Sequence, residues 1–244
     1  MIKKIIFMLI LSLFLVNCSD DDNPVKPDGK KTLPEISLKK IELPQSFAES
    51  TNPYQMLAKS CIESANLFNN YSYMWTPPKN SNKMNKVQDE WIRTWKDDKT
   101  GLEVKLIVYD NDTEFGWTVY LSGNLDGITL TNQKVLEAKE IKATKSGSVK
   151  FFDFEAQKLS FSWEYSTDSN GVYTVNYLMY DEDENLVSRF EIISNPDGSG
   201  SVNTYEKSES GTEVLINNVT WNADGTGTWA HYDSSGNLIS SGSF

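Results

Sequence analysis

Few residues of this 244-residue chain could carry covalent or metal chemistry. The chain has one histidine, His231, and two cysteines, Cys18 and Cys61. A nucleophile–histidine catalytic arrangement would have to use His231, and no Gly-x-Ser-x-Gly turn lies near it. Cys61 and His231 alone cannot supply the nitrogen and sulfur ligands of a tetrahedral zinc site. We therefore expect a protein that is not an enzyme, with no metal and no cofactor, in which His231 is an ordinary strand residue.

Acidic residues gather at 181–185, with the sequence Asp-Glu-Asp-Glu-Asn. A calcium-binding EF-hand loop would need glycine at its sixth position and glutamate at its twelfth, where this chain has Leu186 and Ile192. The segment is therefore predicted to be an acidic hairpin turn, and a loose surface calcium site stays open as the alternative. A pair of carboxylates for glycoside hydrolysis also stays open, although no local motif selects two of them.

Aromatic side chains are the better candidates for a binding role, since the chain contains seven tryptophans and eleven tyrosines. An aromatic ring exposed on a sheet face can stack on a sugar, whereas a buried ring fills the core. Both interpretations stay open for each tryptophan. The candidate ligand-binding residues are Trp163, Trp221, Trp229 and Tyr232.

The formal net charge of −11 argues against nucleic acid as a partner, because an acidic surface repels phosphates and no basic patch is evident. The same acidity favours solubility.

The N-terminus has the pattern of a secretory leader. Lys3 and Lys4 precede an apolar stretch from Ile5 to Val16, which is too short for an ordinary membrane-spanning helix. The ending Leu-Val-Asn-Cys at 15–18 resembles a bacterial lipobox, although asparagine replaces the usual small residue before Cys18. The acidic run at 19–22 resembles the tether of Bacteroidota lipoproteins that are exported to the cell surface. This resemblance implies a signal peptide at 1–17, acylation of Cys18 and a lipid-anchored protein of the outer membrane, exposed on the cell surface.

Three regions follow Cys18. Residues 18–46 are rich in Asp, Pro and Lys and are predicted to form a flexible tether. Asn52-Pro53 is a helix-start pattern, and apolar residues then recur every three or four positions up to Phe68, which predicts one helix over 53–69. From Trp91 onward the apolar period is two, which predicts antiparallel strands joined by hairpins, including the ambiguous segment 133–144. Residues 47–244 are predicted to be a single β-rich domain.

An internal repeat supports this hairpin interpretation. Similar segments begin at residues 117, 147, 173, 200 and 227, and each spacing suits two strands and two turns. The last copy, 227–240, contains Gly-Thr-Trp, Tyr-Asp and Gly-Asn-Leu-Ile-Ser, and it resembles a MORN-variant repeat of bacterial surface proteins. The resemblance covers about 20 residues and carries no catalytic residue.

We therefore expect a mainly-β fold, a long antiparallel meander of ten to twelve strands in a curled sheet or half-barrel, with the helix packed on it. The expected function is a cell-envelope lipoprotein that binds a glycan or an envelope protein without catalysis. The alternative is a carrier that holds an apolar ligand between the sheet and the helix.

Overall fold

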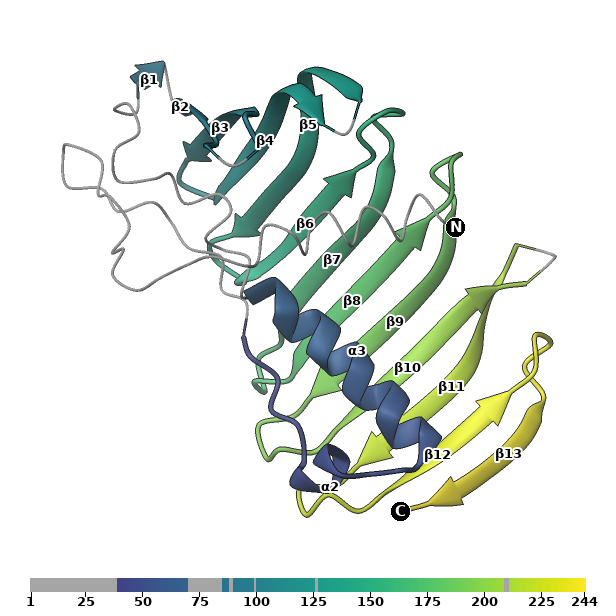
Figure 1. The fold of residues 1–244 in the computed structure, drawn as a ribbon. Helices are drawn as coiled ribbons and strands as arrows, with labels where there is room; N and C mark the ends of the chain where they lie inside the picture. The colour runs from purple at the N-terminus through teal and green to yellow at the C-terminus, as the bar shows by residue number, and fades with distance from the viewer. Residues whose placement is uncertain (1–38, 70–84, 88–89, 99, 126, 209–210) are drawn as a thin grey trace.

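The computed structural model describes residues 39–69, 85–87, 90–98, 100–125, 127–208 and 211–244 (Figure 1). The predicted signal peptide, Cys18 and the tether up to residue 38 lie outside the described residues. Thirteen strands form one antiparallel sheet in which each strand pairs with its neighbours in sequence. They are β1 (Asn85–Val87), β2 (Glu90–Lys96), β3 (Glu103–Asp110), β4 (Glu114–Leu125), β5 (Ile128–Ile141), β6 (Ser146–Phe152), β7 (Leu159–Thr167), β8 (Tyr173–Tyr180), β9 (Leu186–Ser194), β10 (Gly200–Lys207), β11 (Glu213–Trp221), β12 (Gly227–Tyr232) and β13 (Leu238–Ser243).

The predicted mainly-β meander is confirmed. Twelve strands have six residues or more, and the three-residue β1 is the thirteenth. The sheet does not close into a barrel, since β1 and β13 are its two edges in the described chain. Segment 133–144 is a strand as far as Ile141, as predicted, and residues 142–145 make the turn that follows.

Each sequence repeat corresponds to one hairpin. The copies at 147, 173, 200 and 227 start at or within one residue of the start of β6, β8, β10 and β12, and the copy at 117 lies in β4. All five copies therefore lie on even-numbered strands, which run in the same direction because consecutive strands are antiparallel.

Six hairpins share a five-residue turn. In each turn, the backbone N–H of the first residue donates to the carbonyl of the fifth residue. The backbone N–H of the fourth residue donates to the carbonyl of the first residue. The fourth residue has a positive φ, which glycine adopts without strain. The six residues at this position are Gly171, Glu184, Gly198, Gly211, Gly225 and Gly236. The prediction that 181–185 is a hairpin turn is thereby confirmed, with Glu184 at φ 61° in the glycine position.

The helix α3 (Pro53–Asn69) spans the predicted residues and packs across β9, β10 and β11 (Figure 1). Asn52 caps it as the sequence indicates, since its Oδ1 accepts the N–H of Tyr54 at 2.9 Å. Ala58 and Ile62 are fully buried and belong to the same core as Ile192, Val202 and Val219, which are also fully buried. We call this face of the sheet the inner face, and the opposite one the outer face.

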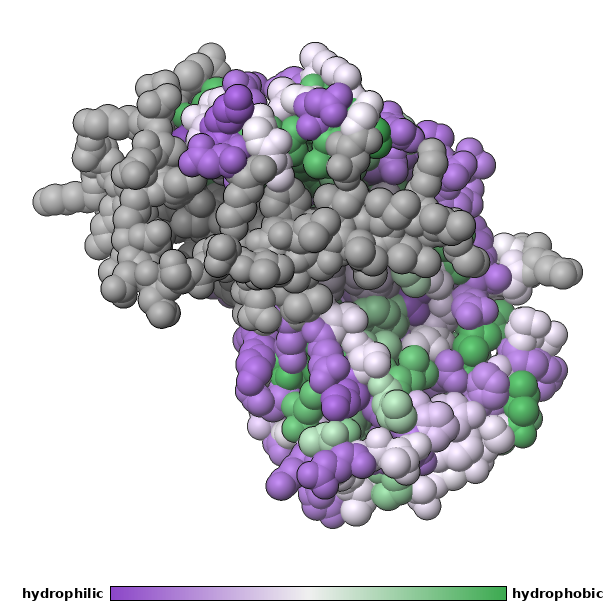
Figure 2. Space-filling view, in the orientation of Figure 1, coloured by the Kyte–Doolittle hydropathy of each residue, from purple (hydrophilic) through white to green (hydrophobic). Residues whose placement is uncertain are grey.

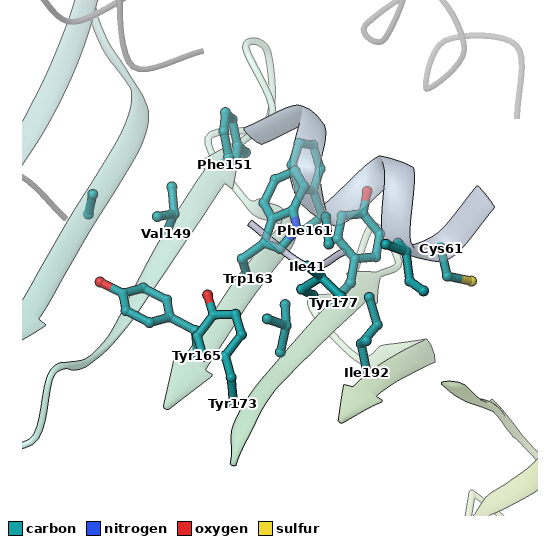
Figure 3. Packing of buried hydrophobic residues seen from close by; sticks show 14 of the residues in the cluster. Ile41, Cys61, Val149, Phe151, Phe161, Trp163, Tyr165, Tyr173, Tyr177 and Ile192 are labelled. Atoms are coloured by element: carbon teal, nitrogen blue, oxygen red, sulfur yellow. The ribbon is translucent and has the colours of Figure 1, made fainter. Parts of the chain in front are cut away.

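A second group of inner-face side chains consists of stacked rings. Phe151 stacks on Phe161, Trp163 makes edge contacts with both Phe161 and Tyr177, and Tyr177 stacks on Phe190. Figure 3 shows Phe161, Trp163 and Tyr177 on the side of the sheet where the helix lies. The rings give the centre of the sheet a continuous apolar layer.

The predicted tether is too long at its C-terminal end. Ile41 is buried, and Asn66 of α3 holds its backbone N–H and carbonyl at 2.8 and 2.7 Å. The short helix α2 (Gln45–Ala48) then places Phe47 in the core against Trp221 and Phe244. Residues 39–46 therefore belong to the folded domain. The sequence predicts a tether here because Ile41 and Phe47 are isolated apolar residues, and the residues that they contact are distant in sequence.

Strand glycines lie beneath aromatic rings of the neighbouring chain segments. At Gly200, a Cβ would lie 2.5 Å from Cζ2 of Trp221, its cross-strand partner. The same close approach recurs along the sheet, in the pairs Gly116–Tyr109, Gly147–Tyr165, Gly227–Phe244 and Gly242–Trp229. These rings occupy space that a side chain would fill, which explains why three of the five sequence repeats begin with glycine.

Candidate functional site

Two of the four predicted ligand-binding aromatics are core residues. Trp163 is 7% exposed and Trp221 is 4% exposed. The Trp221 indole donates to the carbonyl of Gly198 at 3.0 Å, and its ring meets Phe47 edge-on. The assignment of Trp163 and Trp221 as candidate ligand-binding residues is therefore wrong. The core interpretation, which the sequence also left open, describes both rings, since packing on the 39–69 segment and on neighbouring rings buries them.

Trp229 and Tyr232 are half-buried on β12. Tyr54 of α3 stacks on Trp229 with ring centroids 3.9 Å apart, and Gly242 lies against the same indole. Trp229 thus anchors the start of α3 to the sheet and is not a free stacking surface. No described contact assigns a ligand to Tyr232.

His231 lies on the inner face beside α3, in a short row of polar side chains. Its Nδ1 lies 2.9 Å from Oδ1 of Asn217, and Nδ2 of Asn217 donates to Oγ1 of Thr204 at 2.8 Å. The Tyr54 ring is 6.1 Å away. In the view of Figure 2, the surface over α3 and the C-terminal strands mixes apolar and hydrophilic side chains.

Cys61 is buried on α3 and is chemically shielded. Burial raises the pKa of its thiol to about 12, because the thiolate would lose its hydration. No group of three or more His, Cys, Asp or Glu side chains that could hold a metal ion occurs among the described residues. None of the described helices is both long and apolar enough to cross a membrane.

The outer face carries an organised set of polar side chains. Register pairing aligns them in one row across seven strands, from β5 to β11. We call this set the outer row: Lys139, Ser148, Glu164, Asn176, Glu191, Asn203 and Asn218.

Hydrogen bonds fix the C-terminal half of the outer row. Nδ2 of Asn218 donates to Oδ1 of Asn203 at 2.6 Å, and Nδ2 of Asn203 donates to Oε2 of Glu191 at 3.0 Å. Arg189, two residues before Glu191 on β9, donates from Nη1 to Oδ1 of Asn176 at 2.9 Å.

Arg189 is itself held in place by its neighbours. Its Nε donates to Oε1 of Glu213 at 3.0 Å, and its guanidinium lies 3.9 Å from the ring centre of Tyr205. Amide, carboxylate and guanidinium groups in fixed positions provide both donors and acceptors toward solvent, which suits recognition of a polar partner.

The N-terminal half of the outer row borders a depression. It has a volume of about 340 Å³ and opens on the outer face of β5 to β8. Ser146 and Ser148 are short, and Ser148 is only 9% exposed, so they form the floor. The longer, exposed side chains of Lys139 and Glu164 form opposite rims. The volume is at the lower end of that of small-molecule sites, which is roughly 300–1,000 Å³.

The outer row is not evident in the sequence, because its members are ordinary polar residues on separate strands. Alternation along β7 alone predicts that Glu164 lies on the face of the sheet opposite to the apolar side chains. The strand register is needed to align Glu164 with Ser148 and Asn176. The only sequence indication was the regular spacing of the hairpins, which keeps equivalent residues in register.

No protein-family model matches the chain, and no curated protein is significantly similar to it.

Proposed function

We propose that this protein is a lipid-anchored binding module of the bacterial outer membrane, exposed on the cell surface, that recognises a glycan or an envelope protein without catalysis. The observation that carries the proposal is the outer row with its hydrogen-bonded half around Arg189 and Glu191. Polar groups held in fixed positions on the outer face stay in contact with solvent and are therefore available to a partner. Membrane attachment would come from acylated Cys18, which the N-terminal sequence pattern supports.

The packing under α3 favours this module over the apolar-ligand carrier. Ala58 and Ile62 have no exposed surface, and the inner-face residues Ile192, Val202 and Val219 are equally buried. A carrier needs space between the helix and the sheet, whereas these side chains fill it. The resemblance to MORN-variant repeats is compatible with a surface module and stays a prediction.

The proposal can be tested on cells that display the full-length protein. Arg189→Ala combined with Glu191→Ala should lower binding to immobilised envelope polysaccharide or envelope protein at least about tenfold, because it removes the fixed outer-face groups. Met56→Ala is the matched control, since this exposed residue lies on α3 on the opposite side of the sheet. Equal binding by both variants would refute a role for the outer face.

Anchoring requires a separate measurement. Replacing Cys18 by Ala should abolish metabolic labelling with palmitate and release the chain from the membrane fraction. Protease treatment of intact cells should digest the wild-type domain, and full protection would contradict surface exposure.

A further inference from the structure

We infer that the depression between Lys139 and Glu164 is a binding site for one uncharged sugar unit of a polysaccharide. The inference rests on the proposed binding function and specifies its ligand. It follows from the floor, the rims and the direction of the outer row.

The floor requires a ligand that forms hydrogen bonds. Ser148 is nearly buried beneath the depression, and further hydroxyls come from Ser146 on the same strand, β6, and from Ser166 on β7. An apolar group placed here would displace water from these hydroxyls without replacing its hydrogen bonds, which costs about 1–3 kcal/mol for each unsatisfied group. A sugar ring offers hydroxyls that both donate and accept.

The rims select against ligands of net charge. Lys139 and Glu164 are the cross-strand neighbours of Ser148 on its two sides, so their backbones stand about 10 Å apart at the usual strand spacing. A phosphate or a carboxylate that approached Lys139 would meet the like charge of Glu164 across the same depression, and a cation would meet Lys139. A neutral hydroxylated ring accepts from the ammonium at one end and donates to the carboxylate at the other.

The outer row continues beyond the depression and provides further polar groups for a polymeric ligand. Asn176 lines the depression and continues into Glu191, Asn203 and Asn218 on β9 to β11. From β5 to β11 the row is about 29 Å long at the usual strand spacing. Regularly placed amide and carboxylate groups beyond the depression suit the following units of the same chain.

The test is isothermal titration calorimetry of the full mature lipoprotein in a zwitterionic detergent. The probes are cellohexaose, maltohexaose and mannohexaose, compared with a heparin hexasaccharide and inorganic phosphate. At least one neutral hexasaccharide should bind, and heparin and phosphate should not compete with it.

The decisive variant is Ser148→Leu, which fills the floor with an apolar side chain and should weaken binding at least tenfold. Ser201→Leu is the control, because Ser201 is also a serine on the outer face but lies on β10 outside the depression. Glu164→Gln is a second test variant, and it does not require the fold to accommodate a larger side chain at position 148. This rim residue is exposed, so the variant should fold normally and bind the neutral probe about two- to tenfold more weakly.

Three results would overturn the inference: binding of none of the neutral hexasaccharides, preference for heparin or phosphate, or unchanged affinity in both Ser148→Leu and Glu164→Gln. If the neutral probes fail but the Arg189/Glu191 double variant still loses binding on cells, the sugar site is refuted while the outer-face binding module stands.

Discussion

The contact between Gly200 and Trp221 gives a quantitative test of how the sheet is held together. In Gly200→Ala, the new Cβ would clash with the carbonyl oxygen of Ile193 and would lie 2.5 Å from Cζ2 of Trp221. The indole cannot turn aside freely, because it donates to the Gly198 carbonyl and packs on Phe47.

The expected cost combines three contributions. Overpacking in a well-packed core costs about 1–3 kcal/mol, and loss of the indole hydrogen bond would add roughly 0.5–1.5 kcal/mol. Replacing glycine stabilises by about 0.4–1 kcal/mol through the unfolded chain. We therefore expect Gly200→Ala to lower the free energy of unfolding by roughly 0.5–4 kcal/mol, with a fall in Tm of about 2–4 °C for each kcal/mol in a domain of this size.

The assay is urea unfolding followed by tryptophan fluorescence and circular dichroism. Ser201→Ala, the next residue on β10, points to the outer face and should change stability by less than about 0.5 kcal/mol. In a Trp221→Ala background, Gly200→Ala should cost at least about 0.5 kcal/mol less, because the ring is gone. If Gly200→Ala is as stable as Ser201→Ala, the ring does not pack on Gly200 and the reasoning fails.

Three further predictions concern the helix, the thiol and the turns. Ile62→Ala should destabilise the fold by about 2–5 kcal/mol in urea unfolding, since this side chain is fully buried, whereas exposed Met56→Ala should change stability by less than about 0.5 kcal/mol; equal effects would contradict the packing of α3. Cys61 should react with iodoacetamide in urea but scarcely in the native protein at pH 8, because its pKa is raised to about 12, and comparable rates by mass spectrometry would show that it is accessible. Hydrogen bonds from Ser199 to Asp197 and from Asn237 to Asp233 lower the pKa of each turn carboxylate in the folded state. The stabilisation from these hydrogen bonds is present above the ordinary aspartate pKa and is lost as pH falls through the lowered pKa values. Thermal stability should therefore drop below about pH 4, and it should drop less in the variant Asp197→Asn/Asp233→Asn.

Much of the fold follows from local patterns in the sequence. Asn52-Pro53 and the three-to-four spacing after it predicted α3 at its observed bounds, and the period of two predicted strands and hairpins. These signals are local: a cap, a turn glycine or an alternating strand depends on neighbours within a few residues. The regular spacing of the repeats then fixed the order of strands, because short turns allow only adjacent antiparallel pairing.

Which aromatic rings are buried could not be predicted, because that depends on what covers each one. Trp163, Trp221 and Trp229 all sit on alternating strands, yet neighbouring rings, α2 and α3 each cover a different one. The end of the tether was missed for the same reason, since the partner of Ile41 is Asn66 of α3, which is distant in sequence.

The sequence by itself determined the strands, the helix, their order and the expectation of an N-terminal lipid anchor, since each depends on contiguous residues. Only the tertiary structure decided which polar side chains act together. Lys139, Ser148 and Glu164 are separated by loops in the chain, and hydrogen-bonded register brings them side by side on one face. A binding surface on a sheet runs across the strands, whereas a sequence runs along them.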